Sequence, residues 1–291
     1  MKLSLIIPAK SKDDPKLAEL LKSIEMQDFE KSELETLIIT EGTSESAKAI
    51  GIRKAKGEVV GFLASDNELT TPIFLSTMYH FSLESGSAYP ERYSYFENDN
   101  ALNRYFALIG GNDPLSYYIG KNDKASYLEV VLRNKNLTHG DNGFFIRKEL
   151  IEATNLNNYF HIDNAYEADV IPRPISLDIW HKTGGNIFSF FKKRYRYGLE
   201  HAFNKNRRWH LVDFSKPQDI WRLIWFISCT LMIIEPLILS FRGYLKIKDK
   251  AWFLHLPVCF LTLVTYFVLV LHIGLRNLTQ SLSAPMKDQI A

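Results

Sequence analysis

The sequence predicts an α/β protein with a Rossmann-like, mostly parallel sheet flanked by helices, followed by a pair of hydrophobic membrane helices. Up to residue 63, short apolar runs of strand length alternate with amphipathic runs of helix length. Near the carboxyl end, apolar segments at about 219–241 and 251–274 match the roughly 20 residues that cross a hydrocarbon core. We therefore expect one domain at 1–212 and a membrane-attachment region at 213–291.

The first strands and helices follow from the spacing of apolar residues. The run Leu3–Ile7 is apolar and ends at Pro8, as is typical of a buried strand that leads into a loop. The predicted elements after it are a helix at 14–27, a strand at 37–40, a helix at 44–56 and a strand at 59–63. Short connections between them predict right-handed parallel crossovers. Ligands of such sheets bind beyond the carboxyl ends of the strands, where Lys10, Glu41 and Asp66 fall.

Later elements rest on weaker patterns. We expect helices at 72–85 and 102–109, a strand at 142–146, a short helix at 148–154 and an aromatic, basic surface helix at 187–203.

Charge and cysteine content exclude some classes of protein. The 35 basic and 33 acidic residues give a net charge of only +2, which argues against a nucleic-acid binder. Between residues 192 and 208, however, seven basic residues accompany a single acid, and such a cluster before an apolar segment indicates contact with anionic lipid or phosphate. Cys229 and Cys259 each lie in an apolar run, so the sequence predicts neither a disulfide framework nor a zinc site of clustered thiolates.

The two apolar segments differ in quality. Residues 252–273 carry no formal charge and form the better span, with tryptophans near the segment ends as interfacial anchors. The first segment contains Glu235 and Pro236, which are costly in lipid and interrupt a helix, so a re-entrant, interfacial or protein-packed segment is the alternative to a full span. Two buried core helices are the alternative to membrane attachment. The basic cluster places the preceding domain on the cytoplasmic face, and the short apolar amino terminus does not resemble a signal peptide.

Five pieces of the amino-terminal region resemble, in order and spacing, the nucleotide-binding half of glycosyltransferase family 2, an inverting family with a GT-A fold. They are Ser4–Pro8, Gln27, Leu37–Ser44, Ala55–Glu58 and Phe62–Asn67. Farther along, Gly140–Lys148 and His161–Asp163 resemble that family's acceptor-side strand and catalytic acidic motif. The resemblance covers about residues 1–200 and implies a nucleotide-binding half at 1–100 and an acceptor half at 101–212. The apolar tail is similar to that of members that act on lipid-linked acceptors.

The resemblance implies a donor and metal site around the third strand. Asp66, with Asn67 beside it, is expected to bind the donor ribose or a divalent cation, Mn or Mg, which offsets the charge of the departing nucleoside diphosphate. The family usually has another Asp two positions earlier, where this chain has Ala64. His181 resembles a histidine that completes the metal site, and imidazole suits Mn better than Mg. The alternatives are a helix cap at Asp66 and an ordinary surface histidine at His181.

Other residues resemble the family's base-binding and catalytic positions. Glu41 matches an acid that binds uracil or guanine, with Pro8 and Lys10 forming the opposite wall; a solvated turn carboxylate is the alternative. Asp163 is the candidate general base, or orients an acceptor that is already ionised. Its rivals are Asp141 and Asp169.

Two further groups complete the candidate site. Asp141, Asn142 and Gly143 lie in the acceptor-side segment. Lys193, Arg194 and Arg196 are candidates for binding the donor diphosphate, an acceptor phosphate or lipid head groups, because arginine geometry favours phosphate and the neighbouring aromatic residues favour an interface. A solvated helix face is the alternative.

We therefore expect an inverting transfer from a UDP- or GDP-sugar to a membrane lipid-linked or envelope-glycan acceptor; a homo-oligomer is compatible with the sequence. A nucleotidyltransferase is a second reading, but it would need a glycine-rich first loop, and residues 8–13 contain no glycine. A third reading is a non-catalytic membrane scaffold. Ala64, and Ile162 where relatives commonly carry Glu before the catalytic Asp, favour it.

Overall fold

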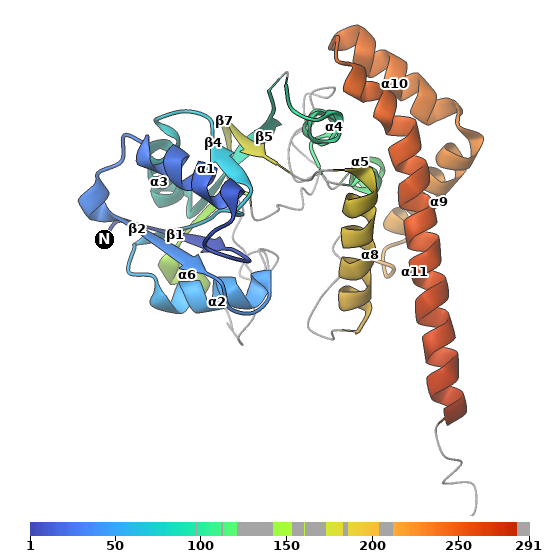
Figure 1. Cartoon of the computed structure of the whole chain (residues 1–291), viewed down its shortest axis with the longest axis horizontal. Coiled ribbons are helices and arrows are strands. Elements are labelled where there is room, and N and C mark those ends of the chain that lie inside the picture. The colour runs from blue at the N-terminus through green and yellow to red at the C-terminus, as the bar shows by residue number, and fades with distance from the viewer. Residues whose placement is uncertain are drawn as a thin grey trace, which may run out of the picture. The chain divides into compact units, whose positions relative to one another are not determined.

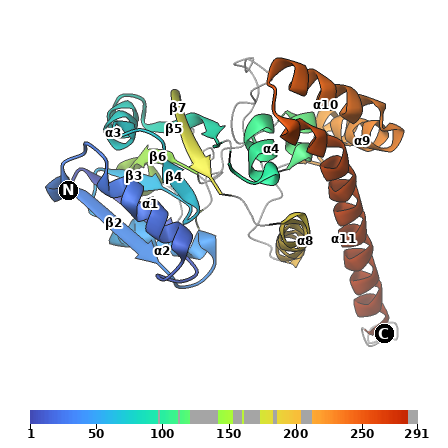
Figure 2. The ribbon, with the colours of Figure 1, turned by 45° about the horizontal axis from the view of Figure 1, so that its top comes forward.

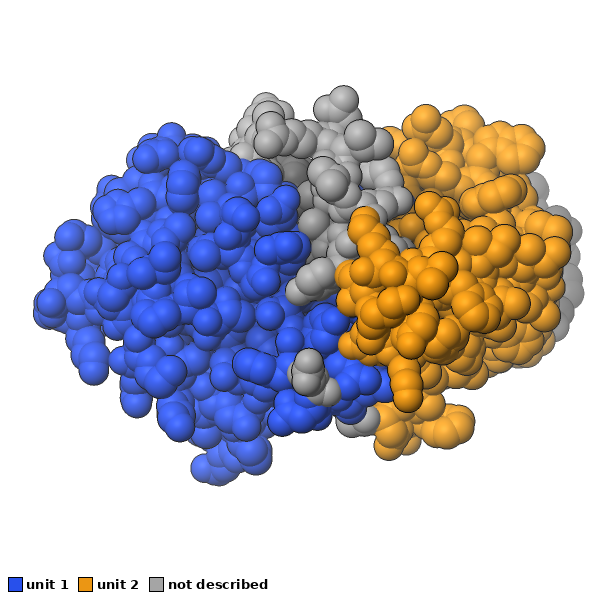
Figure 3. Space-filling model, turned by 90° about the horizontal axis from the view of Figure 1, so that it is seen from above, with its two compact units in different colours: residues 1–112, 120–183 blue, residues 113–119, 184–291 orange. Residues whose placement is uncertain are grey.

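The computed structural model describes residues 1–96, 98–111, 113–120, 142–152, 160, 173–182, 186–203 and 212–283. The chain divides into two compact units (Figure 3). The first unit consists of residues 1–112 and 120–183, and the second of residues 113–119 and 184–291. The first unit carries the sheet and the second is helical, and each is described by itself below.

The first unit is built on a mixed sheet (Figures 1 and 2). Among the described residues the sheet has seven strands in the order β2-β1-β3-β6-β5-β7-β4. The strands are β1 (Leu3–Pro8), β2 (Leu34–Ile39), β3 (Val59–Phe62), β4 (Asn67–Leu69), β5 (Ser87–Ser94), β6 (Phe144–Arg147) and β7 (Arg173–His181).

The predicted parallel arrangement is confirmed for the first three strands, but the sheet as a whole is mixed. β1 pairs parallel with both β2 and β3, and β5 pairs parallel with β7. β6, in contrast, runs antiparallel to both β3 and β5, and β4 runs antiparallel to β7. The reason is that an apolar run such as Phe144–Ile146 reports burial but not strand direction. The expected α/β class therefore holds, with a mixed sheet in place of a mostly parallel one.

Helices cover both faces of the sheet. Their bounds are α1 (Pro15–Glu25), α2 (Ser44–Lys54), α3 (Phe74–Ser85), α4 (Ala101–Ile109) and α6 (Lys148–Glu152), with a 3₁₀ turn at Lys31–Glu33. Side chains alternate along β1, so that Leu5 and Ile7 join the core with Leu17 and Leu20 of α1, whereas Ile6 joins the opposite core with residues of α2. This alternation buries both faces and leaves the carboxyl ends of the strands as the accessible edge.

The second unit is a group of helices. It contains α5 (Pro114–Ile119), α8 (Ile187–Phe203), α9 (Pro217–Met232), α10 (Ile234–Lys246), a 3₁₀ turn at Lys250–Leu254 and α11 (His255–Ser283). A small apolar core joins α5, α9 and α11 through Leu115, Ile119, Phe226 and Cys259. α8 packs along the middle turns of α11, where a Cβ added at Gly198 would lie 2.3 Å from Leu269 (Figure 1).

The carboxyl-terminal segments are not clearly the predicted pair of membrane helices. The first segment breaks into α9 and α10, whose axes differ by 85°. The break lies at Ile233, whose φ is +68°, and it places Pro236 in the first turn of α10, where proline is tolerated. The second segment agrees with the prediction, because Lys250–Thr279 is long and apolar enough to cross a membrane. Among the described residues, this is the one helix that meets these criteria, and the bent pair α9–α10 would be a second span only if the two helices are counted together.

Candidate functional site

Several predicted site residues follow the carboxyl ends of three adjacent strands. Pro8 ends β1 opposite Ile39, the last residue of β2. Lys10 and Glu41 follow those two strand ends and are exposed. β3 ends beside β1, where the Leu63 amide donates to the Ile6 carbonyl at 3.1 Å. The parallel half of the sheet therefore gathers this group at one edge, as the topology predicts.

A tight turn after β3 positions Asp66. The Asn67 amide donates to the Ala64 carbonyl at 2.9 Å, and the Ala64 amide donates to Asn67 Oδ1 at 2.8 Å. β4 then begins at Asn67, which pairs with His181 at the end of β7. The Lys182 amide also donates to the Asp66 carbonyl at 2.9 Å. Asp66 is thus fixed by backbone bonds on both sides of its turn.

This pairing brings Asp66 and His181 together. His181 Nε2 lies 3.3 Å from Asp66 Oδ1, and their side chains are 10% and 18% exposed. His181 is therefore a half-buried residue in contact with the candidate metal ligand and not an isolated surface histidine. Its ring also faces the ring of Tyr93, with centroids 5.3 Å apart.

The pair fits a divalent cation as part of a larger ligand set. One carboxylate oxygen and one imidazole nitrogen in contact can bind the same ion, and this donor set suits Mn better than Mg. Over the described ranges, no cluster of three or more His, Cys, Asp or Glu side chains could hold a metal. Two protein ligands leave several positions for substrate oxygens or water. The metal roles of Asp66 and His181 stay predictions.

A buried polar network supports the turn. Asn67 Nδ2 donates to Asn142 Oδ1 at 3.0 Å, and Asn142 Nδ2 donates to the Tyr93 hydroxyl oxygen at 2.7 Å. The exposures of Asn67, Asn142 and Tyr93 are only 1%, 6% and 2%. Both amide atoms of Asn67 are thus occupied inside the protein. Its predicted contact with the donor stays a prediction, whereas its contribution to the turn is visible in these bonds.

Tyr93 is the member of this network that sequence reasoning missed. Its partner Asn142 lies 49 positions away, and only the pairing of β5 with β6 and β7 brings the two together. Neither a motif nor a periodicity marks such a contact in advance.

Gly143 allows the acceptor-side segment to approach the sheet. Its φ is +79°, and an added Cβ would lie 2.8 Å from Pro90 Cγ. The Gly143 amide donates to the Phe62 carbonyl at 3.0 Å. A side chain at this position would strain the backbone and collide with Pro90 of β5 and Ile179 of β7. Gly143 and its neighbour Asn142 thus have structural roles, and their predicted acceptor-side role stays a prediction.

Lys182, which follows His181 in the chain, carries a positive charge beside the turn. Its ammonium lies 3.2 Å from Glu68 Oε2, also contacts Glu19, and sits 4.1 Å above the Trp180 ring. Burial alone would lower the pKa of Lys182, but hydrogen bonds to Glu19 and Glu68 outweigh it and raise the pKa. Lys182 is therefore a firmly protonated side chain held by carboxylates.

Asp163, its rival Asp169 and Asp141 fall outside the described residues. Lys193, Arg194 and Arg196 lie on α8 in the second unit, and their assignment to phosphate stays a prediction.

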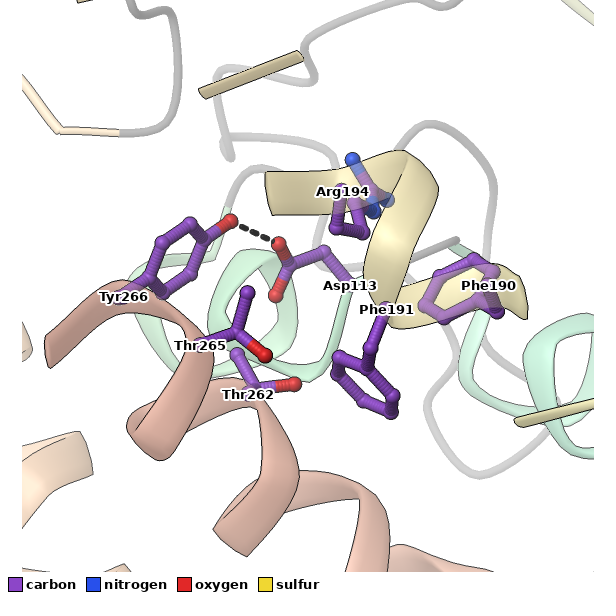
Figure 4. A pocket seen from close by; sticks show the side chains of 7 residues that line it. All are labelled: Asp113, Phe190, Phe191, Arg194, Thr262, Thr265 and Tyr266. Carbon is purple, nitrogen blue, oxygen red and sulfur yellow. Dashed lines mark hydrogen bonds between the residues drawn. The ribbon is translucent and has the colours of Figure 1, made fainter. Parts of the chain in front are cut away.

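Arg194 lines a hollow between α5, α8 and α11 (Figure 4). The Tyr266 hydroxyl donates to the buried Asp113 carboxylate there, and the Leu115 amide donates to the other Asp113 oxygen at 2.9 Å. This hollow has no room for a water molecule. It is therefore a packed contact between helices and not a ligand pocket.

The chain is similar to known glycosyltransferases in its three-dimensional structure but not detectably in its sequence. No family model and no curated protein matches the sequence. The mannosyltransferase PcManGT from Pyrobaculum calidifontis, in complex with GDP-Man and Mn²⁺, has a TM-score of 0.52 at 10% identity, over 92% of this chain and 87% of that one.

S. aureus TarS is more distant in structure. TarS 1–349 with UDP-GlcNAc has a TM-score of 0.44 at 16% identity, over 88% of this chain and 91% of that one. A longer TarS chain has a TM-score of 0.41 at 18% identity over 72% of this chain, which spans only 41% of it. The likeness to the mannosyltransferase, with the mixed sheet and its edge, shows that this chain has a glycosyltransferase fold.

Proposed function

We propose that this chain is an inverting glycosyltransferase that moves a sugar from a UDP- or GDP-sugar to a lipid-linked or envelope-glycan acceptor. The single observation that supports it most is the contact between Asp66 and His181 at the edge where sheets of this kind bind ligands. The fold likeness to a mannosyltransferase in complex with GDP-Man and Mn²⁺ agrees with this reading.

The proposed site divides binding from chemistry. Asp66 and His181 would hold the cation, which when bound offsets the charge of the departing diphosphate. Pro8, Lys10 and Glu41 would bind the base and its ribose. The network through Asn67 keeps Asp66 at its position in the turn. These residues would bind the donor and stabilise the departing diphosphate, and they would not take the proton of the acceptor.

Asp163 is the proposed base for the acceptor hydroxyl, or orients an acceptor phosphate that is already ionised. Asn142 and Gly143, with Asp141 before them, would border the acceptor. Lys193, Arg194 and Arg196 are proposed as cations for a phosphate of donor or acceptor.

We place the enzyme on the cytoplasmic face of a membrane. The catalytic domain is proposed at 1–212 and the attachment region at 213–291, without a role for nucleic acid. α11 is long enough to cross a bilayer or to lie along its surface. The proposal names the class of donor but not its sugar, and it does not depend on the oligomeric state of the protein.

Release of the nucleotide tests this function. The purified full chain with Mn²⁺ is incubated with a panel of UDP- and GDP-sugars, with and without a polyprenyl phosphate acceptor, and free UDP or GDP is measured. We expect release from one donor, loss of release in Asp66→Asn, and slow transfer with intact donor binding in Asp163→Asn.

The scaffold reading gives a different result. Ala64 in place of a second carboxylate is the observation that favours it. A protein that releases no nucleotide from any of these sugars, with or without the polyprenyl phosphate, would be such a scaffold even if it binds nucleotide, and the transferase proposal would be abandoned.

A further inference from the structure

One face of α11 is an exposed apolar stripe. Large hydrophobic side chains that are 41–63% exposed recur at intervals of three, four or seven residues. They begin in the 3₁₀ turn before α11 and continue to the last turns of the helix. They are Phe253, Phe260, Val264, Phe267, Leu271, Leu275 and Leu278. In an α-helix this spacing keeps side chains on one side, so the stripe is continuous over several turns.

The opposite face of α11 is covered by protein and carries polar side chains. His255, Cys259 and Thr262 are at most 4% exposed. His255 Nε2 lies 3.2 Å from the Tyr118 hydroxyl of α5, and Tyr266 donates to Asp113. Farther along, where α11 becomes more exposed, the Tyr195 hydroxyl of α8 still lies 2.5 Å from His272 Nδ1. A helix surrounded by lipid would not present one polar, covered side over this length.

The covered stretch spans much of the thickness of a bilayer. From His255 to Leu269, which is 8% exposed, the helix rises about 21 Å, at about 1.5 Å per residue. The hydrocarbon core measures about 30 Å. If α11 crossed the membrane, the helices packed along this stretch would enter the core with it.

Those neighbouring helices are unsuited to hydrocarbon. α8, which packs along Thr262–His272, carries Lys192, Lys193, Arg194 and Arg196. Cationic side chains in the bilayer centre are costly unless they reach the head groups. α5 adds a second constraint, because residues 113–119 are flanked in sequence on both sides by residues of the sheet-bearing first unit. The chain would have to enter and leave the membrane around a six-residue helix.

α9 and α10 also present apolar side chains on a bent path. Their axes differ by 85°, and at about 1.5 Å per residue the two helices are only about 24 and 20 Å long, so neither alone crosses the core. Exposed apolar residues on α10 repeat with helical spacing, at Ile234, Leu237, Ile238, Phe241 and Leu245. A short bent pair of this kind can be buried in one leaflet.

Basic residues alternate with this apolar surface. Arg242, Lys246, Lys248 and Lys250 are exposed around the end of α10, beside the exposed Phe241, Leu245 and Phe253. Their acidic neighbour Asp249 caps the following turn, where Asp249 Oδ1 accepts from the Ala251 amide at 2.8 Å. Cations mixed with large apolar side chains complement the anionic head groups and the acyl chains just below them.

We propose that the second unit binds one leaflet of an anionic phospholipid bilayer, with α11 lying in the plane of the interface and no helix of α8–α11 crossing the membrane. This inference rests on the membrane attachment within the proposed function and replaces a crossing by one-sided insertion. It does not depend on the glycosyl transfer.

Labelling from one side tests the arrangement. Lys250→Cys and Thr279→Cys place thiols near the two ends of the candidate span, at exposed positions. Lys31→Cys, exposed in the first unit, reports which side that unit occupies. The full-length variants are bound to preformed sealed phosphatidylglycerol–phosphatidylcholine vesicles and treated outside with a membrane-impermeant maleimide. The parent chain is the background control, because Cys229 and Cys259 are buried.

We expect all three variants to be labelled to the same extent without detergent. If α11 crosses, Thr279→Cys is protected until detergent is added while Lys250→Cys reacts; if the bent pair crosses and α11 returns, the pattern reverses. Either pattern overturns the inference. If the parent chain does not co-float with the vesicles in a density gradient, membrane attachment itself is overturned as well. The transferase proposal is then still decided by nucleotide release, which is measured separately.

Matched substitutions test the lipid contact itself. Phe267→Asp changes a stripe residue that is 62% exposed, and Met26→Asp changes an equally exposed residue, 63%, in the first unit. We expect Phe267→Asp to weaken vesicle binding at least about tenfold, since a large apolar contact is lost and a charge is added, and Met26→Asp to leave it unchanged. Lys246→Gln and Lys248→Gln should each weaken binding about fivefold on anionic vesicles only. Equal effects of Phe267→Asp and Met26→Asp would contradict the stripe as the contact.

Discussion

Asp66 and His181 come into contact because the start of β4 lies beside the end of β7, a strand far away in the sequence. The β4–β7 pairing sets Asn67 opposite His181, and the turn at residues 64–67 turns Asp66 toward the imidazole. A carboxylate and an imidazole in contact give a stronger cation site than either alone, because the charge and the two donor atoms act on one ion.

We therefore predict that Asp66→Asn and His181→Asn each weaken Mn²⁺ binding at least about tenfold, since even the loss of an outer-shell partner costs that much in metal sites. Calorimetric titration of the full chain with Mn²⁺ and nucleotide measures the change. Glu68→Gln is the control, because that carboxylate contacts Lys182. A drop in Glu68→Gln as large as in Asp66→Asn would place the cation elsewhere.

The hydrogen bond from Asn142 to Tyr93 gives a second prediction for single residues. Tyr93→Phe removes the acceptor and leaves a buried amide unpaired, so we expect the first unit to lose about 1–3 kcal/mol of unfolding free energy. Denaturant unfolding of Tyr93→Phe, Asn142→Ala and the double variant measures it. The double variant should lose less than the sum of the single losses; additive losses would show that the two side chains do not depend on each other.

Elements could be predicted from the sequence where their signal is local. β1, α1, β2, α2 and β3 follow from runs of apolar residues and helical spacing within about a dozen positions. The alternation of Ile175, Leu177 and Ile179 is a local signal for β7 as well. β5 was harder, because Pro90 and Glu91 interrupt its pattern and two neighbouring strands supply its pairing.

The candidate site also contains residues that local signals predict and residues that depend on long-range pairing. Lys10, Glu41 and Asp66 could be placed at one edge because strand ends in a parallel unit are set by topology. The Asn67–Asn142–Tyr93 network could not be predicted, since it depends on β6 running antiparallel beside β3, and an apolar run does not encode direction.

The break between α9 and α10 yields a prediction at the scale of the element. Ile233 has a φ of +68°, which costs a residue with a Cβ roughly 1–2 kcal/mol. Ile233→Gly removes that strain but adds about 0.4–1 kcal/mol of unfolded-state entropy, so we expect a net stabilisation of up to about 1.6 kcal/mol.

Ile234→Gly is the matched control, because Ile234 is the first residue of α10, and glycine there should destabilise by about 0.5 kcal/mol. Thermal unfolding in one detergent measures both variants. Destabilisation by Ile233→Gly equal to that by Ile234→Gly would mean that the bend is not strained at residue 233.

At the scale of the whole molecule, the two units have separate apolar cores and separate proposed ligands. The cores of the first unit lie on the two faces of the sheet, and that of the second joins α5, α9 and α11. A ligand raises the unfolding free energy of the part that binds it, by about 2.7 kcal/mol at a concentration of 100 Kd. A nucleotide sugar should therefore stabilise the first unit, and anionic lipid the second.

Calorimetry of the full chain, followed by hydrogen exchange to assign each transition, can separate the two effects. We expect the cognate nucleotide sugar with Mn²⁺ to raise the transition of the sheet-bearing unit, and Asp66→Asn to abolish this shift while leaving the response to phosphatidylglycerol intact. Phe267→Asp should do the reverse. If either variant abolished both responses, binding at the sheet edge and binding at the bilayer would be coupled, and the catalytic state of the enzyme would depend on its attachment to the membrane.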